Sequence, residues 1–529
     1  MKKLLLLFVV LFVLILVGLK IFVYFYLSDE RIRTTIIPMA EKSLNCKLNI
    51  GMIDVSLFKG VFLKDFSLIA NNQPNISIKG TEFTLRYSLL PLLTRNAKLQ
   101  INTQKLQVKD SSGQLPTIES EANINLTVDL GKTTTAAPIF HGRLDLTSDL
   151  IYDALKAKVT GSCDFTQDEL HILADTSLDQ ATVKIDAMIN DYLKNPSMQI
   201  DLTSEQLDLE YLAGLADSLP AKPAATIGEE TKEKPVTTAP TVSGKIFITK
   251  LLYKDLVIDN FSIHYNMTDN QLNIESITAL LAGGNIAANA KADLGQNVPP
   301  YSGSVELDRI ELADILTGIR FEPASLLSGK LYTYLTFNGQ GTTWPQLGDQ
   351  LNGKGEFALT EGRANDLPLT REIATLLEIK EINDLKFQDL SGKVQITDGK
   401  IELNSSLTSD DLTARTIGTA DLNGTLNLPL EIKLSPKLST MLGKNIDATK
   451  YLADEEGQTT LALQVTGSIN EPKITLNSAE LENQLKKSAE EKAFDELNKI
   501  IKSNTKSGSK EEQIYQDLGN EIMQGVLNN

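Results

Sequence analysis

A long apolar run lies near the N-terminus of this chain. Residues Leu4 to Leu27 are apolar except for Lys20 and the neutral Gly18. As a helix rising ~1.5 Å per residue, this run would extend about 36 Å, enough to cross a hydrocarbon core of ~30 Å with some tilt. Lys20 lies near the far end, where its stem can follow apolar surface while its ammonium group reaches the headgroups. We therefore predict a transmembrane anchor over residues 1–27.

A cleaved signal peptide is the alternative for this run. Its apolar region would be only ~7–15 residues long and would end in a small-x-small cleavage site, and neither feature is present. Orientation is less evident, because Lys2 and Lys3 before the run are opposed by Arg31 and Arg33 after it. A short N-terminal tail followed by a long polar body is typical of a signal anchor, which predicts that the body lies outside the cytoplasm.

The rest of the chain is long, acidic and poor in aromatic residues. The 529 residues include 68 acidic and 51 basic side chains, for a net charge of −17. This charge disfavours binding of the body to nucleic acid or to an anionic membrane surface. Aromatic residues make up 6%, with Trp344 as the single tryptophan, so platforms for stacking bases or sugars are scarce. Contact with a membrane is therefore expected to be hydrophobic.

The spacing of apolar residues changes after residue 44. Between Ser28 and Leu44 the spacing is helical, and Pro38 is expected to kink or divide that helix. Beyond it the period becomes two, with turn residues between short runs, which predicts a β meander. Pro429 cannot donate to a ladder and predicts a sheet edge or a bulge at its position. The clearest strand has an apolar face formed by alternating residues: Leu426, Leu428, Leu430, Ile432 and Leu434.

Proline divides the β-rich body. The segment 217–242 holds four prolines and few large apolar residues, so it is predicted to be an extended linker or loop. It would separate an N-terminal β-rich domain over 28–216 from a C-terminal β-rich domain over 243–476. Two passages, starting at Ile200 and Val305, each predict a strand that runs into a short acidic helix. The body is therefore expected to contain related halves.

The chain ends in a predicted helical tail over residues 477–529. Ser478 to Ile501 and Glu511 to Val526 have helical spacing, and a polar, flexible segment separates them. Packing on the body, binding to a partner and fraying all remain open for this tail.

No motif of a catalytic, metal or cofactor site is present. The sequence lacks GxSxG, HExxH, GxxxxGK[ST] and GxGxxG patterns. His141, His171 and His264 are isolated and are expected to be strand or turn residues. Cys46 and Cys163 are far apart without a CxxC motif, so one disulfide and two ordinary thiols both remain open. We expect no enzymatic activity, no metal site and no cofactor.

Four segments, in their order along the chain, carry a family resemblance. Asp54 to Leu68 suits an opening strand pair after an anchor, and Leu256 to Leu294 suits a unit of strand, turn, strand, Gly283-Gly284 and further strand. A third segment begins at Gly353 and continues through a helix into further strands, and the fourth spans Val465 to Leu476. Together they resemble the AsmA family of bacterial envelope proteins. The Pro-rich segment and the tail depart from that pattern.

The resemblance implies a fold like that of bridge-like lipid-transfer proteins: a long curved antiparallel sheet that forms an apolar trough. It also implies an inner-membrane protein with its body in the periplasm, acting in envelope biogenesis. Phospholipid or another lipid would then move along the trough toward the outer membrane. The five alternating residues from Leu426 to Leu434 are candidate floor residues, and the expected partners are membrane lipids and envelope proteins. The core of a closed sandwich is the alternative for that face. A scaffold for assembly or export of outer-membrane proteins is the alternative function.

Overall fold

A computed structural model of the chain describes residues 30–476 except 31, 57–59, 72–74, 89–95, 112–115, 130–138, 153–154, 179–180, 193–194, 219–239, 322–325, 342–347, 349, 423 and 446–452. The predicted anchor, the helical tail, Trp344 and most of the Pro-rich segment lie outside the described residues. Among the described helices, none is long and apolar enough to cross a membrane.

The described residues are mainly β, as predicted, with 23 strands and a few short helices. They divide into two compact units, whose described parts lie within residues 30–253 with Val257–Thr278, and within Lys254–Leu256 with residues 279–476. The division at the Pro-rich segment, between residues 216 and 243, remains a prediction.

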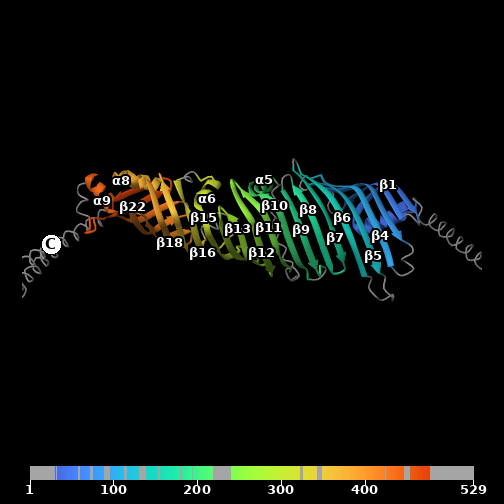
Figure 1. Cartoon of the computed structure of the whole chain (residues 1–529). Helices are drawn as coiled ribbons and strands as arrows, with labels where there is room; N and C mark the ends of the chain where they lie inside the picture. Colours follow the sequence, from blue (N-terminus) through green and yellow to red (C-terminus); the bar gives the residue numbers. More distant parts are fainter. Residues whose placement is uncertain are drawn as a thin grey trace, which may run out of the picture. The chain divides into compact units, whose positions relative to one another are not determined.

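Ten strands of the first unit form an antiparallel meander in which each strand pairs with the next in sequence. Figure 1 shows them from blue to green. Their bounds are β1 Cys46–Ser56, β2 Gly60–Ala70, β3 Ile76–Ser88, β4 Asn96–Asp110, β5 Thr117–Asp129, β6 Ile139–Tyr152, β7 Leu155–Thr166, β8 Glu169–Leu178, β9 Ala181–Asn190 and β10 Ser197–Asp208.

The prediction of an antiparallel sheet is wrong at one place, because β10 and β11 (Thr241–Tyr253) pair in parallel, with Leu202 opposite Ile246. Parallel neighbours need a crossover connection, and here the chain leaves β10 through α5 (Leu209–Ser218) before β11 begins. The strands that flank the Pro-rich segment are therefore direct neighbours. Strands β12 (Leu256–Thr268) and β13 (Gln271–Leu281) follow.

The second unit continues with an antiparallel meander, from green to red in Figure 1. Its strands are β14 Gly284–Asp293, β15 Pro300–Glu311, β16 Leu327–Gln340, β17 Asn352–Asn365, β18 Asp384–Thr397, β19 Lys400–Thr408, β20 Leu412–Asp421, β21 Thr425–Leu434, β22 Thr459–Ser468 and β23 Pro472–Leu476.

Pro429 does not mark a sheet edge, which corrects the prediction. Its strand β21 pairs with β20 on one side and with β22 on the other. The partners to β20 are interrupted around Pro429, but Thr416 opposite Leu430 and Thr419 opposite Asn427 keep one register, so no bulge forms. The hydroxyl of Thr416 donates to the carbonyl oxygen of Pro429 at 2.6 Å. This bond lies where proline has no N–H to donate.

The short helices lie where the strand pattern stops. A π-helical segment, η1 (Ile32–Ile36), precedes α3 (Ile37–Leu44), so the predicted helix is divided just before Pro38. Helix α5 follows β10 and α6 (Leu312–Gly318) follows β15, which confirms the two predicted strand-to-helix passages. The second unit also contains α8 (Pro368–Leu377), the 3₁₀ segment η3 (Lys380–Asn383) and α9 (Pro436–Asn445).

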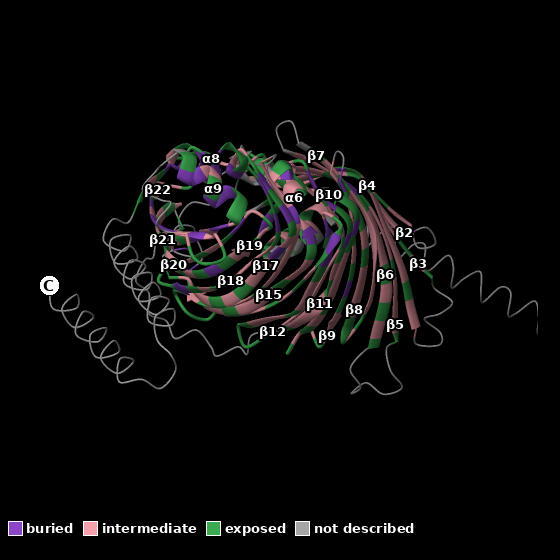
Figure 2. Ribbon diagram, turned by 60° about the vertical axis from the view of Figure 1, so that its left-hand side comes forward, coloured by how far each residue is buried: buried purple, intermediate pink, exposed green. Residues whose placement is uncertain are grey.

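The best-packed part of the second unit lies where α8, η3 and α9 cover the sheet. Figure 2 shows buried residues gathered there, whereas most strand positions are intermediate or exposed. Pro368 suits the first helical position of α8, and Glu378 ends the helix in the left-handed conformation. The core cluster contains Leu434 and Leu438 together with three residues of the segment from α8 to η3: Leu377, Ile379 and Ile382.

Candidate functional site

The five residues predicted as a lipid-binding floor lie on one face of β21. Leu426, Leu428 and Leu430 are half-buried, whereas Ile432 and Leu434 are buried at 2% and 0% exposure. The strand therefore passes from an open part of the sheet to a covered part. Leu434 belongs to the core beside α9, and the other end of the strand leaves apolar side chains accessible.

This face continues across the second unit, although the β15–β16 and β16–β17 pairings each shift register beside it. Each residue of one cross-strand row lies opposite the next, from β15 to β22, and every side chain in the row is apolar: Ile310, Leu331, Leu359, Leu390, Leu407, Ala414, Ile432 and Leu461. Because alternate residues of a strand share one face, the rows on either side of it at spacing two lie on the same surface. We call this surface the apolar face of the second unit.

The first unit has an apolar face of its own. Its clearest row crosses β1 to β10 in register: Val55, Val61, Leu85, Ile101, Ile124, Leu144, Cys163, Ile172, Ala187 and Ile200. No expectation from the sequence placed these residues together on one face. The signal was present in alternations such as that from Ile118 to Val128, where Ile118, Leu126 and Val128 share a face.

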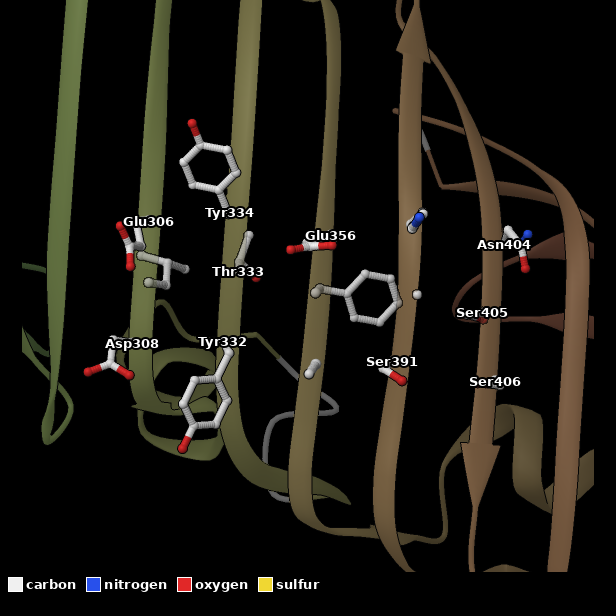
Figure 3. A pocket seen from close by; sticks show the side chains of 15 residues that line it. Glu306, Asp308, Tyr332, Thr333, Tyr334, Glu356, Ser391, Asn404, Ser405 and Ser406 are labelled. Atoms are coloured by element: carbon white, nitrogen blue, oxygen red, sulfur yellow. The ribbon is translucent and has the colours of Figure 1, made fainter.

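The opposite face of the second unit is polar. Glu306, Tyr334, Glu356, Lys393 and Asn404 lie opposite one another across five strands. They border a hollow of about 630 Å³, and Figure 3 shows Tyr332 and Tyr334 pointing away from each other along β16 beside these carboxylates. The contrast between the two faces makes each strand amphipathic.

Charge pairs line the polar faces. Arg143 on β6 lies 2.9 Å from Asp145 and 3.0 Å from Asp164 on β7. The hydrogen bond to Asp145, together with the charges of both carboxylates, raises the pKa of Arg143. Arg363 and Asp384 form a similar pair between β17 and β18 at 2.6 Å. In each case the ions stay in water, so each pair contributes little to stability.

A cavity of about 260 Å³ lies between the apolar face and α8. Its sheet side includes Leu428, Leu430 and Ile432, three of the five predicted residues, and its helix side includes Leu369 and Ile373. Almost all of its surface is hydrocarbon. A site of this kind can hold an apolar ligand by burial, but it offers no catalytic arrangement.

The two cysteines and three histidines do not come together as a reactive group. Cys46 on β1 and Cys163 on β7 are both free thiols. His141, His171 and His264 lie in strands, as expected, and the ring Nε2 of His171 lies 2.9 Å from Asp186 on the neighbouring strand. Within the described part of the chain, no group of three or more His, Cys, Asp or Glu residues is arranged to hold a metal ion.

Comparison with known proteins agrees with this architecture. The model of the AsmA family matches residues 117–406, more than half of the chain and including strands of both units. The chain therefore belongs to the AsmA family. No curated protein and no solved structure matches it.

Proposed function

We propose that this protein is a membrane-anchored lipid carrier of the bacterial envelope. The observation that carries the proposal is the pair of apolar faces, each backed by a polar face. One is continuous across ten antiparallel strands of the first unit and the other across eight of the second. A soluble sandwich would cover such a surface with a second sheet. Outside the region of α8 and α9, half-buried residues such as Ile401 and Leu426 remain accessible instead.

Acyl chains are the ligand that suits this surface. Each methylene group that leaves water is stabilised by ~0.8 kcal/mol, so a chain lying along several rows gains from every row it covers. The headgroup can stay in water at the strand ends. Such a carrier needs no bond to be made or broken, and we propose that it is not an enzyme.

The apolar run from Leu4 to Leu27 supports an anchor in the inner membrane. The body would then lie in the periplasm, where AsmA-family membership favours a role in supplying phospholipid or another lipid toward the outer membrane. The net charge of −17 keeps the body away from anionic membrane surfaces. Loading would therefore depend on the apolar faces and the anchor.

Site-specific photocrosslinking in cells tests this function. A benzophenone side chain replaces Leu426 on the apolar face or Asn427, its exposed neighbour on the polar face. The proposal predicts lipid adducts from position 426 and none from position 427. Protein adducts alone from position 426 would support a scaffold for outer-membrane proteins instead.

A further inference from the structure

The apolar face of the second unit ends against a wall. Helix α8 and the segment η3 lie across its last rows, and Leu377, Ile379 and Ile382 are 1%, 0% and 2% exposed. These residues share one core cluster with Leu434 and Leu461 of the sheet. A hydrocarbon chain that follows the face toward α8 therefore meets packed side chains.

A space remains in front of that wall. The cavity of about 260 Å³ is bounded by Ile373 and Ile382 on the helix side, and on the sheet side it reaches Leu403 and Leu428. Those two leucines are half-buried and lie one row from Ile401 and Leu426 on the accessible part of the face. The cavity thus connects the covered rows with the open rows.

The apolar lining of the cavity determines which kind of ligand it can bind. Apolar cavities of ~150 Å³ lined by Leu, Ile and Phe stay dry and bind small hydrocarbons, so a larger one suits a longer hydrocarbon. The hydroxyl of Thr370 already donates to the carbonyl oxygen of Leu367 at 3.1 Å, and that of Thr416 donates to Pro429. With two of its three lining hydroxyl groups engaged and almost all of its surface hydrocarbon, the cavity suits a hydrocarbon tail and not a headgroup.

We propose that α8 and η3 form the end wall of the lipid-binding face, and that the cavity receives the methyl end of one acyl chain. The carboxyl end and headgroup then lie away from α8, over the rows of Leu403 and Ile401. This inference rests on the proposed function and adds the orientation and position of the bound lipid. A lipid that moves along the apolar face would therefore stop in the second unit, at α8 and η3.

The test uses the full chain and two photoactivatable phosphatidylethanolamines, one with a diazirine near the methyl end of an acyl chain and one with it near the carbonyl group. Both are supplied in phosphatidylethanolamine and phosphatidylglycerol vesicles, and labelled peptides are mapped by mass spectrometry. The methyl-end probe should label α8 and β20 near Ala414, and the carbonyl-end probe should label positions near Ile401 and Leu426.

A matched pair of variants tests the cavity itself. Ala414 lies beneath α8 with Ile432 and Leu407 as cross-strand neighbours, whereas Thr413 is exposed on the opposite face. Ala414→Phe should reduce methyl-end labelling of α8 about tenfold, as expected when roughly two methylene groups lose their burial. Thr413→Phe should leave the labelling unchanged.

The outcomes separate this inference from the proposed function. Equal labelling patterns from the two probes, or labelling of the face without any near α8, would overturn the end wall and leave lipid carriage standing. No labelling of either apolar face would overturn both. The comparison of the two probes uses the wild-type chain, so it tests the end wall even if the Ala414→Phe variant does not fold.

Discussion

Arg371, in α8, donates hydrogen bonds to both carboxylate oxygens of Asp366, which lies just before that helix. The distances are 2.9 Å from Nε to Oδ1 and 2.8 Å from the terminal nitrogen to Oδ2. Asn383, at the end of η3, also donates to Asp366 Oδ1 at 3.2 Å. One exposed carboxylate therefore connects the two segments that cover the end of the apolar face.

Loss of the Asp366 charge should loosen α8. The hydrogen bond from Arg371 holds the pKa of Asp366 below its usual value, so the stabilising contact is present above that value and is lost as the pH falls through the lowered pKa. Asp366→Asn should therefore speed amide hydrogen exchange in α8 at neutral pH, while wild-type protein shows the same change only under acid conditions below pH ~4. Glu381→Gln, a nearby exposed change, is the control. Equal exchange in all three proteins would contradict this account.

Shortening Leu377 should destabilise the end wall itself. This side chain is 1% exposed within the core cluster, and Leu→Ala changes at such sites cost about 2–5 kcal/mol. Hydrogen exchange under native conditions gives the local unfolding free energy of α8 directly. Glu372→Ala, on the exposed side of the same helix, should change that free energy by less than ~0.5 kcal/mol. A comparable loss in both variants would count against the packing described.

Local features of the fold were predictable from the sequence. Alternation such as Leu426 to Leu434 identifies strands, and the passages after Ile200 and Val305 end in α5 and α6 as predicted. The direction of β11 was not predictable, because it depends on the route of the connection after Asp208 and not on any strand pattern. The sheet edge predicted from Pro429 was wrong because the missing N–H of this proline is tolerated inside the sheet.

The candidate site was predictable only in part. The face of β21 was found from its period, but the cavity is built from residues distant in sequence, such as Leu327, Ile373 and Val465. No local pattern indicates that the helix after β17 folds back across the apolar face and contacts β23. Leu434 is likewise not part of the accessible floor, because a helix, α9, covers it.

The parallel pair of β10 and β11 can be tested by one substitution. A Cβ atom at Gly244 would overlap the carbonyl oxygen of Ile200 on β10, so Gly244→Ala should lower the melting temperature of the full chain. Gly214→Ala, in α5 with nothing within 4 Å of the added atom, should instead be neutral or stabilise by roughly 0.5–1 kcal/mol. A tolerated Gly244→Ala would argue against this pairing.

The thiol of Cys163 should react slowly with alkylating agents. Burial, and to a lesser degree the charge of Asp164, raise the pKa of Cys163, so little thiolate forms at neutral pH. In a Cys46→Ala variant, the alkylation rate should be lower than in the urea-unfolded chain and should rise with pH. Intact mass under non-reducing conditions should show two free thiols in the wild type. A disulfide-linked mass would contradict the structure.

Native mass spectrometry of the full-length protein, released from a mild detergent, tests lipid carriage most directly. Lipid carriage predicts copurified lipid on the wild-type chain and its loss from a Leu428→Glu, Leu430→Glu variant, which places two carboxylates on the apolar face. A Thr425→Glu, Asn427→Glu variant adds the same charge to the polar face of β21 and should keep the lipid. Absence of lipid from the wild type, or equal lipid on a folded Leu428→Glu, Leu430→Glu variant, would contradict lipid carriage.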